Sequence, residues 1–477
     1  MSTRPVLAFL FATSALLSLL YLWVTPPWMG PDEPRHYEYA RLLFDKRKLV
    51  GWSDADQALE RAIIASMRRH QFQRLGMVRP ELAGAPLPDR FADIWGAGLA
   101  HELHQPPLAY LVYAAALAPV ADASIEGQLR VLRVVSMLIG LATAWVAMVA
   151  LVRLWPEDRL VGVGAAALVV LLPQRLWLSV TVNNDHLTIF WGALLFAVLV
   201  DAWRQGYRWW HLPTAVALVG LALLTKRTSI VLVGLLGGAL FTAVLVGNVR
   251  RWAVRGLVGG LVLVLAGVLL GPPLWRRLIL QAPGLERTRT TLIYIYFRHV
   301  FDPLPQFRYQ FMPAAWFTVE ELPFWGHYLR LVVESFWGRF GWLNVWLATP
   351  VRLILGVLTG LGLGGVFVQG VRAIRGSLSL EPSQWQALAS GLVALVVAVA
   401  MMIQRLAQDW STGARTSFQM RLLFPILPLL AIYLVWGLTV WVPVRVRSRI
   451  LSLWLASLVV LNLYAIFFRL VPAWQKF

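Results

Sequence analysis

The residues with the clearest chemical potential are two adjacent carboxylates, Asp32 and Glu33, which follow the first long apolar run at residues 6–24. They should therefore lie where a membrane helix emerges into water. Pro34 suits the first turn of a new helix, so we expect Glu33 to be its N-cap and both acids to stay ionised there. Asp32 and His36 are four residues apart and can share a helical face. An ionised carboxylate beside a histidine is suited to general-base catalysis, although a simple acidic cap has the same pattern.

Further polar side chains fall at turns that the apolar runs place on the same membrane face. These are His104, Asp185, Lys226, Arg227 and Arg421. Each has a plainer interpretation: Asp185 suits a helix cap, His104 an ordinary loop, and the cations can extend to lipid phosphates. Two adjacent cations in a short turn between apolar runs nevertheless favour an anionic partner such as a phosphate.

The same acids and histidines bear on cofactors. Asp32, Glu33, His36 and Asp185 are ligand types that a divalent metal accepts, but their spacing matches no metal-binding signature. We therefore assign no cofactor and keep a divalent metal as an open alternative. The chain has no cysteine, which excludes disulfides and thiolate chemistry. It also has no phosphate-binding glycine loop and no nucleophile elbow.

The composition is that of a protein that crosses the membrane many times. Of the 477 residues, 58% are hydrophobic and 14% charged, and the mean hydropathy is +0.65. Many of the 24 tryptophans fall near the ends of apolar runs, as interfacial anchors do. The net charge of +19 lies largely beside those runs, where it indicates topology and attraction to anionic lipid rather than nucleic-acid binding.

The apolar runs predict an all-α transmembrane helical bundle with about eleven crossings. The runs are 6–24, 131–152, 160–180, 187–203, 212–225, 228–247, 256–272, 351–370, 385–403, 422–440 and 450–468. Arginine pairs or triplets occupy every second connection, so the positive-inside rule places those connections and the N-terminus in the cytoplasm. The run 107–120 is too short for a crossing and is interpreted as a juxtamembrane or re-entrant helix. Two outer segments result, 25–106 and 272–350.

Several motifs, in order along the chain, resemble the GT-C superfamily of membrane glycosyltransferases. Its members include the protein O-mannosyltransferases and the aminoarabinose transferase of lipid A. The motifs are Pro31-Asp32-Glu33-Pro34-Arg35-His36, His104-Gln105-Pro106-Pro107-Leu108, Arg133-Val134-Val135-Ser136, Asn183-Asn184-Asp185, Leu224-Thr225-Lys226, and the late stretches at 336–342 and 421–425. The late stretches resemble those of a poorly characterised bacterial branch. The chain has Gln105-Pro106 where the aminoarabinose enzyme has Lys-Pro, and it shows no large soluble C-terminal domain.

The resemblance implies an inverting transfer of a sugar from a polyprenyl-phosphate donor to a cell-envelope acceptor. It implies a GT-C-like catalytic module at 1–350 followed by transmembrane helices at 351–477. Asp32, Glu33 and Asp185 would be the catalytic acids, and His36, His104, Lys226, Arg227 and Arg421 would bind substrate. The expected location is a bacterial inner membrane with a periplasmic active site. The acceptor, whether glycan, lipid or protein, stays open.

Two other functions would need a similar transmembrane topology and similar charged residues. A transporter or flippase of lipid-linked saccharides should carry charged residues inside its membrane runs and show internal repeats. Most charges here lie at the ends of runs, and the sequence shows no repeat. A polysaccharide ligase has a similar topology but depends on arginine and histidine in its outer loops, for which the arginine-rich second outer segment is suited.

Overall fold

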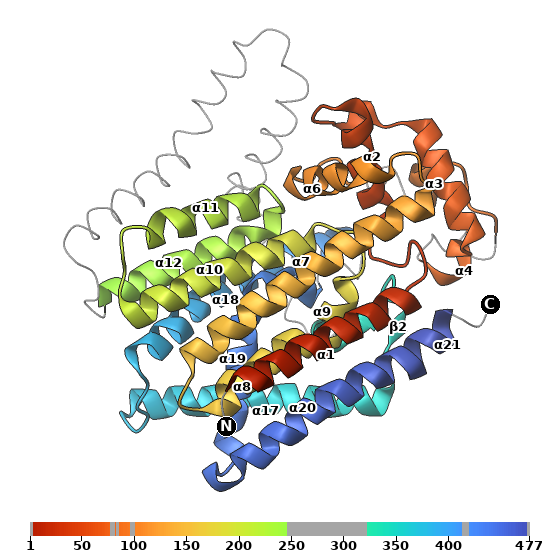
Figure 1. Cartoon of the computed structure of the whole chain (residues 1–477). Coiled ribbons are helices and arrows are strands. Elements are labelled where there is room, and N and C mark those ends of the chain that lie inside the picture. Colours follow the sequence, from red (N-terminus) through yellow and green to blue (C-terminus); the bar gives the residue numbers. More distant parts are fainter. Residues whose placement is uncertain are drawn as a thin grey trace.

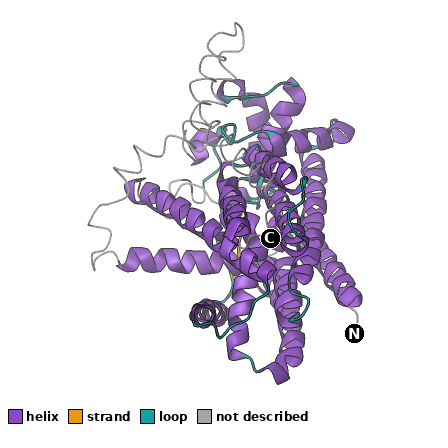
Figure 2. Ribbon diagram, turned by 90° about the vertical axis from the view of Figure 1, so that its left-hand side faces the viewer, coloured by secondary structure: helices purple, strands orange, loops and turns teal. Residues whose placement is uncertain are grey.

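The computed structural model describes residues 3–76, 82, 85–95, 101–245, 322–412 and 419–474, and it is built almost entirely from helices (Figures 1 and 2). The first half contains α1 (Thr3–Val24), α2 (Glu33–Lys46), α3 (Gln57–Arg69), α4 (Phe72–Leu75), α5 (Phe91–Trp95), α6 (Leu108–Leu117), α7 (Ile125–Leu154), α8 (Arg159–Leu171), α9 (Pro173–Leu178), α10 (Asp185–Gln205), α11 (His211–Leu223) and α12 (Ile230–Leu245). The second half contains α16 (Leu322–Trp337), β1 (Arg339–Phe340), β2 (Val345–Trp346), α17 (Thr349–Ile374), α18 (Pro382–Thr412), α19 (Leu427–Leu438), α20 (Arg447–Tyr464) and α21 (Val471–Trp474).

Nine helical segments among the described residues are long and apolar enough to cross a membrane. They cover nine of the predicted runs and confirm a multi-pass all-α protein. The predicted run 212–225 forms the shorter helix α11, and the run 256–272 lies outside the described residues. The run 107–120 is a short helix, α6 followed by one 3₁₀ turn at Ala118–Val120, as its length predicts.

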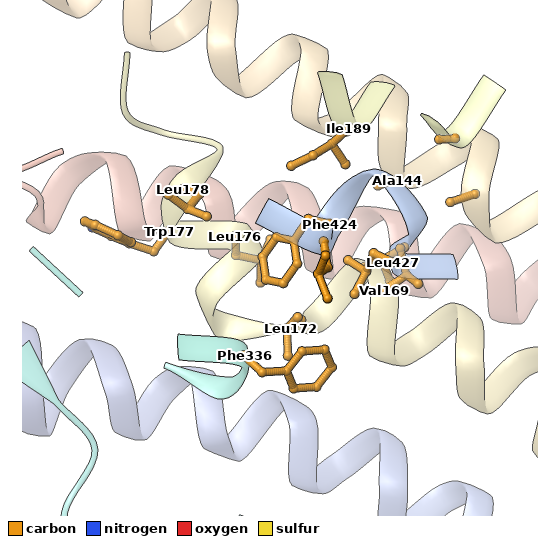
Figure 3. Close-up of a cluster of buried hydrophobic side chains, with 14 of the residues drawn as sticks. Ala144, Val169, Leu172, Leu176, Trp177, Leu178, Ile189, Phe336, Phe424 and Leu427 are labelled. Carbon is orange, nitrogen blue, oxygen red and sulfur yellow. The ribbon is translucent and has the colours of Figure 1, made fainter. Parts of the chain in front are cut away.

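The centre of the bundle is α8, in which every residue from Leu160 to Leu171 is buried. Its sequence is rich in Ala, Gly and Val, which let α7, α19 and α20 pack closely around it. Leu172 breaks the helix before Pro173, and α9 continues in a new direction. Figure 3 shows Leu172 and Leu176 of this bend meeting Phe336 and Phe424 from the late part of the chain. The bend therefore ties the two halves of the chain together.

The segment between α1 and α7 covers one end of the bundle (Figure 1). There α2 packs against α6, with His36 and Tyr39 stacked against Tyr110. Trp28, which precedes the carboxylates, is fully buried and donates its indole N–H to Ser66 Oγ of α3 at 3.0 Å. The turn between α1 and α2 is thus fixed from several sides.

The opposite end of the bundle carries the short basic connections. Arg153 of α7 pairs with Asp201 of α10 at 3.0 Å, and Arg204 pairs with Glu381 at 3.5 Å. Arg447 at the start of α20 pairs with Asp158 before α8. These contacts show that the arginine-rich connections among the described residues share one face, as the alternating charge pattern predicts. The connection with Arg250, Arg251 and Arg255 lies outside the described residues.

Candidate functional site

Asp32 occupies the residue before α2 in a left-handed backbone conformation, with φ at 58°. The helix begins at Glu33, and no side chain caps it, so the expectation that Glu33 is the N-cap is wrong. A non-glycine residue in this region costs of order 1 kcal/mol and persists only where its surroundings hold it. The Asp32 carboxylate is a quarter exposed and pairs with Arg35 one turn along the helix.

Glu33 points the other way, into the protein. Its carboxylate is fully buried and accepts two bonds from the Arg133 guanidinium at 2.7 and 2.8 Å. It also accepts the backbone N–H groups of Gly30 at 3.2 Å and Val182 at 2.9 Å. Arg133 donates further bonds to the carbonyls of Thr25 and Pro26, both at 2.7 Å. Glu33 therefore fastens the turn to α7 and to the segment before α10, and it does not line the cavity described below.

Asp185, at the start of α10, sits between two cations. Lys226 Nζ donates to its carboxylate at 2.5 Å, and the Arg421 guanidinium lies 3.6 Å away. The same guanidinium lies 3.6 Å from Asp32, so Arg421 bridges the two acids. The Lys226 side chain is only 12% exposed and points inward, away from any lipid phosphate at the surface. Burial lowers the pKa of Lys226, and the adjacent Asp185 acts in the opposite direction.

The histidines near these groups are neutral bases. Burial lowers the pKa of His36 to about 3, and its Nδ1 shares a hydrogen bond with the Tyr110 hydroxyl at 2.8 Å. Burial also lowers the pKa of His104. Glu102 stays ionised: burial acts to raise its pKa, but the Arg35 guanidinium and the hydrogen bond from the Gln105 amide favour the carboxylate and bring the value to about 2.

These side chains surround a cavity of about 190 Å³ at the end of the bundle covered by α2 and α6. Its lining comes from five separate stretches of the chain: Asp32, His36, Glu102, His104, Gln105, Asn184, Lys226, Arg227, Thr228, Arg421 and Leu422. Six of the eight predicted site residues line it directly. Asp185 lies immediately behind Lys226 and Arg421, and Glu33 lies in the turn below.

Seven groups in or beside the cavity were not assigned to the site from sequence: Glu102, Gln105, Asn184, Thr228 and Leu422 in its lining, and Arg35 and Tyr110 beside it. Glu102 and Asn184 belong to the quoted motifs or their flanks, so their neighbours could have indicated them. Arg35, paired with Asp32, is also within a motif. Tyr110 carries no sequence signal, because a tyrosine in an apolar run is most often an ordinary core residue.

The arrangement favours an anion over a metal ion. Across the described residues, no group of three or more acids and histidines is placed to hold a metal. Both oxygens of Glu33 are taken by Arg133, and Asp32 and Asp185 face arginine and lysine. The ligand set Asp32, Glu33, His36 and Asp185 is therefore not assembled in this structure.

The fold and this site define a multi-pass membrane protein with a polar cavity, lined by two acids and three cations, at one end of its helical bundle. The chain matches the family described as "Predicted membrane protein (DUF2142)" over residues 16–430 and belongs to it. No curated protein matches it.

Two similar solved structures are glycosyltransferases of GT-C type. The oligosaccharyltransferase of Archaeoglobus fulgidus is 16% identical with a TM-score of 0.46, over 98% of this chain and 52% of that one. ArnT from Cupriavidus metallidurans, solved bound to undecaprenyl phosphate, is 18% identical with a TM-score of 0.44, over 98% of this chain and 65% of that one. The chain thus spans about half to two thirds of their length. GT-C is also the superfamily that the sequence motifs resemble.

Proposed function

We propose that the protein is a membrane glycosyltransferase that moves a sugar from a polyprenyl-phosphate donor to a hydroxyl of a cell-envelope acceptor. The observation that carries the proposal is the cavity itself, where a partly exposed carboxylate, Asp32, faces Lys226, Arg227 and Arg421. A sugar held between a base and a cluster of cations is placed for displacement of a phosphate.

In the proposed reaction Asp32 accepts the proton of the acceptor hydroxyl as its oxygen attacks the anomeric carbon. The new carbon–oxygen bond forms on one face while the bond to the phosphate oxygen breaks on the other, so the configuration inverts. The leaving polyprenyl phosphate takes both electrons of the broken bond. Lys226, Arg227 and Arg421 stabilise its added negative charge.

Neutral His36 and His104 suit hydrogen bonding to sugar hydroxyls, because each has one donor and one acceptor nitrogen. Glu33 is excluded from direct chemistry in this proposal, since its oxygens are bound inside the protein. Asp185 orients Lys226 and Arg421 toward the donor phosphate. The location is proposed to be a bacterial inner membrane, with the cavity on the periplasmic side.

A flippase or transporter would also bind a lipid-linked saccharide. The cavity lies at one end of the bundle and is lined by two acids, neutral histidines and cations together, which suits group transfer at that end. The second outer segment, on which the ligase alternative depends, lies largely outside the described residues.

The test compares two aspartates of the same helix region in purified protein supplied with a synthetic polyprenyl-phosphate sugar. Asp32→Asn keeps the size of the side chain but removes the base, so transfer should fall by about a hundred- to ten-thousandfold. Asp45→Asn is the matched control, because Asp45 is exposed, pairs with Arg41 on the surface of α2 and does not line the cavity. Equal rates of transfer for Asp32→Asn and the wild type would show that Asp32 is not the base, which contradicts the proposal.

A further inference from the structure

Away from the cavity, arginines gather around one carboxylate where α16 ends and α17 begins. Glu334 is buried and accepts from Arg330 at 2.7 Å, from Arg339 at 3.1 Å and from Arg352. Arg469 lies close by, donating at 2.7 Å to the carbonyl of Trp346, which pairs with Arg339 in the hairpin. None of these residues lines the cavity.

Among the described residues, only Glu334 pairs with these arginines, and one carboxylate cannot balance their positive charge. Arg330, Arg339 and Arg352 leave an excess of two charges around Glu334, and Arg469 adds a third. Burial, and repulsion from Arg330 and Arg352, lower the pKa of Arg339 although Glu334 opposes them. Arg352 Nε is buried and has no hydrogen-bond partner in the part of the chain that the structure describes. A partly desolvated excess of this kind is costly unless an anion joins it.

The arginine cluster lies at the N-terminal end of α17, beside a face of this helix that is exposed and apolar. Leu353, Val357 and Leu361 follow Arg352 along α17 and are 66%, 63% and 45% exposed. The α17 helix lies at the edge of the bundle (Figure 1). Trp346, 38% exposed beside the arginines, is an aromatic of the kind that marks a membrane interface.

Directly below Arg352, at four-residue spacing, are Gly356, Gly360 and Gly364. A Cβ at any of these three positions would meet no atom within 4 Å. The three glycines therefore leave open space beside Leu353, Val357 and Leu361. The neighbouring Gly362 and Gly365 are different, since they pack tightly on Leu434 and Gly437 of α19. The two sets of glycines therefore lie on different faces of α17, and only the second serves helix packing.

We propose that this arginine cluster binds the phosphate headgroup of an anionic membrane phospholipid, with an acyl chain lying along the exposed face of α17. Guanidinium groups match phosphate oxygens in pairs, and the exposed Arg330 together with Nε of Arg352 supplies donors. The apolar face beneath the cations fits the hydrocarbon of a lipid, which a free phosphate lacks. The site is independent of the proposed glycosyl transfer.

The test measures which lipids the purified full-length protein retains after reconstitution in vesicles of phosphatidylglycerol and phosphatidylcholine. The wild type should retain phosphatidylglycerol in preference. Arg330→Gln and Arg352→Gln should each reduce that preference about fivefold, because one cation near anionic lipid contributes about that much. Glu334→Gln should increase it, since it removes the carboxylate that competes with the headgroup for these arginines. Arg47→Gln, an exposed cation after α2 with no part in the cluster, is the matched control and should change nothing.

Three results would overturn the proposal. One is equal lipid preference in the wild type and Arg330→Gln, which is decisive even if Arg352→Gln fails to fold, because Arg330 is 64% exposed. A second is displacement of the bound lipid by millimolar inorganic phosphate, which would assign the cluster to a free anion. Retention of phosphatidylcholine as strongly as phosphatidylglycerol would likewise contradict the proposal, because the charge of the headgroup would then not determine which lipid binds.

Discussion

Asp32 and Glu33 are neighbours in the chain, yet their carboxylates have opposite surroundings. The left-handed backbone at Asp32 turns its side chain toward the cavity, while Glu33, in the first turn of α2, points back at Arg133. Asp32 keeps a quarter of its side chain exposed, whereas Glu33 has none. Of two identical functional groups, only the first can reach a substrate.

Lys226 provides a direct test of donor binding. Lys226→Ala should lower kcat/KM about ten- to a hundredfold, because a charge-assisted contact to phosphate contributes roughly 1.5–3 kcal/mol. The measurement is transfer from a synthetic polyprenyl-phosphate sugar. Lys48→Ala is the control, since Lys48 is more than half exposed and pairs with Asp54 outside the cavity. If Lys226→Ala transfers and binds donor like the wild type, the lysine serves only to neutralise Asp185.

His36 should make the folded protein sensitive to acid. Its pKa is about 3 in the folded protein and about 6.5 in an unfolded chain, so the unfolded state binds the proton first as pH falls. Its contribution to stability is therefore complete above about pH 6.5 and is lost on acidification, by up to about 1.4 kcal/mol per pH unit. Thermal unfolding of the wild type and His36→Gln in detergent between pH 7 and 5 measures this, and the variant should show the flatter dependence. Parallel curves would show that another group controls acid stability.

At the scale of elements, the site depends on a clamp between the turn before α2, the helix α7 and the segment before α10. Glu33 and Arg133 form it, and Gly30 allows it, because a Cβ there would lie 2.6 Å from Thr181. The clamp joins the turn that carries Asp32 to Val182, just before Asn184 and Asp185, and neither Glu33 nor Arg133 lines the cavity. A buried ion pair of this kind is costly to break from one side only.

Glu33→Gln should therefore act on stability. It leaves Arg133 buried without its counterion, which should reduce the free energy of unfolding by about 3–5 kcal/mol. Asp32→Asn, one residue earlier, should change it little. Thermal unfolding of both variants in the same detergent separates them. A Glu33→Gln protein that unfolds with the wild type yet has lost transfer would place this carboxylate in the chemistry after all.

The sequence could predict most elements and much of the site because long apolar runs, adjacent acids and misplaced cations are local signals. Nine membrane helices and the six cavity residues Asp32, His36, His104, Lys226, Arg227 and Arg421 follow from them. The role of Glu33 could not be predicted, because it depends on Arg133, about a hundred residues away. The position of Tyr110 depends likewise on how α6 packs on α2.

At the scale of the whole molecule, the two ends of the bundle differ in charge chemistry. One end holds the cavity and the layer formed by α2 to α6, and the other holds the paired basic connections at Arg153, Arg204 and Arg447 (Figure 1). The positive-inside rule therefore predicts a single orientation, with the basic end in the cytoplasm and the cavity outside. Because the two ends are built from the same membrane helices, fixing the side of one fixes the other.

That orientation can be tested with two engineered cysteines, since the natural chain has none to react in the background. Ser53 is exposed in the layer over the cavity, and Ser377 is exposed in the connection between α17 and α18 at the basic end. In intact cells a membrane-impermeant maleimide should label Ser53→Cys and leave Ser377→Cys unlabelled until the membrane is opened. Labelling of Ser377→Cys in intact cells, with Ser53→Cys protected, would show that the protein has the opposite orientation in the membrane. The cavity would then face the cytoplasm, and a donor presented on the outer leaflet could not reach Asp32.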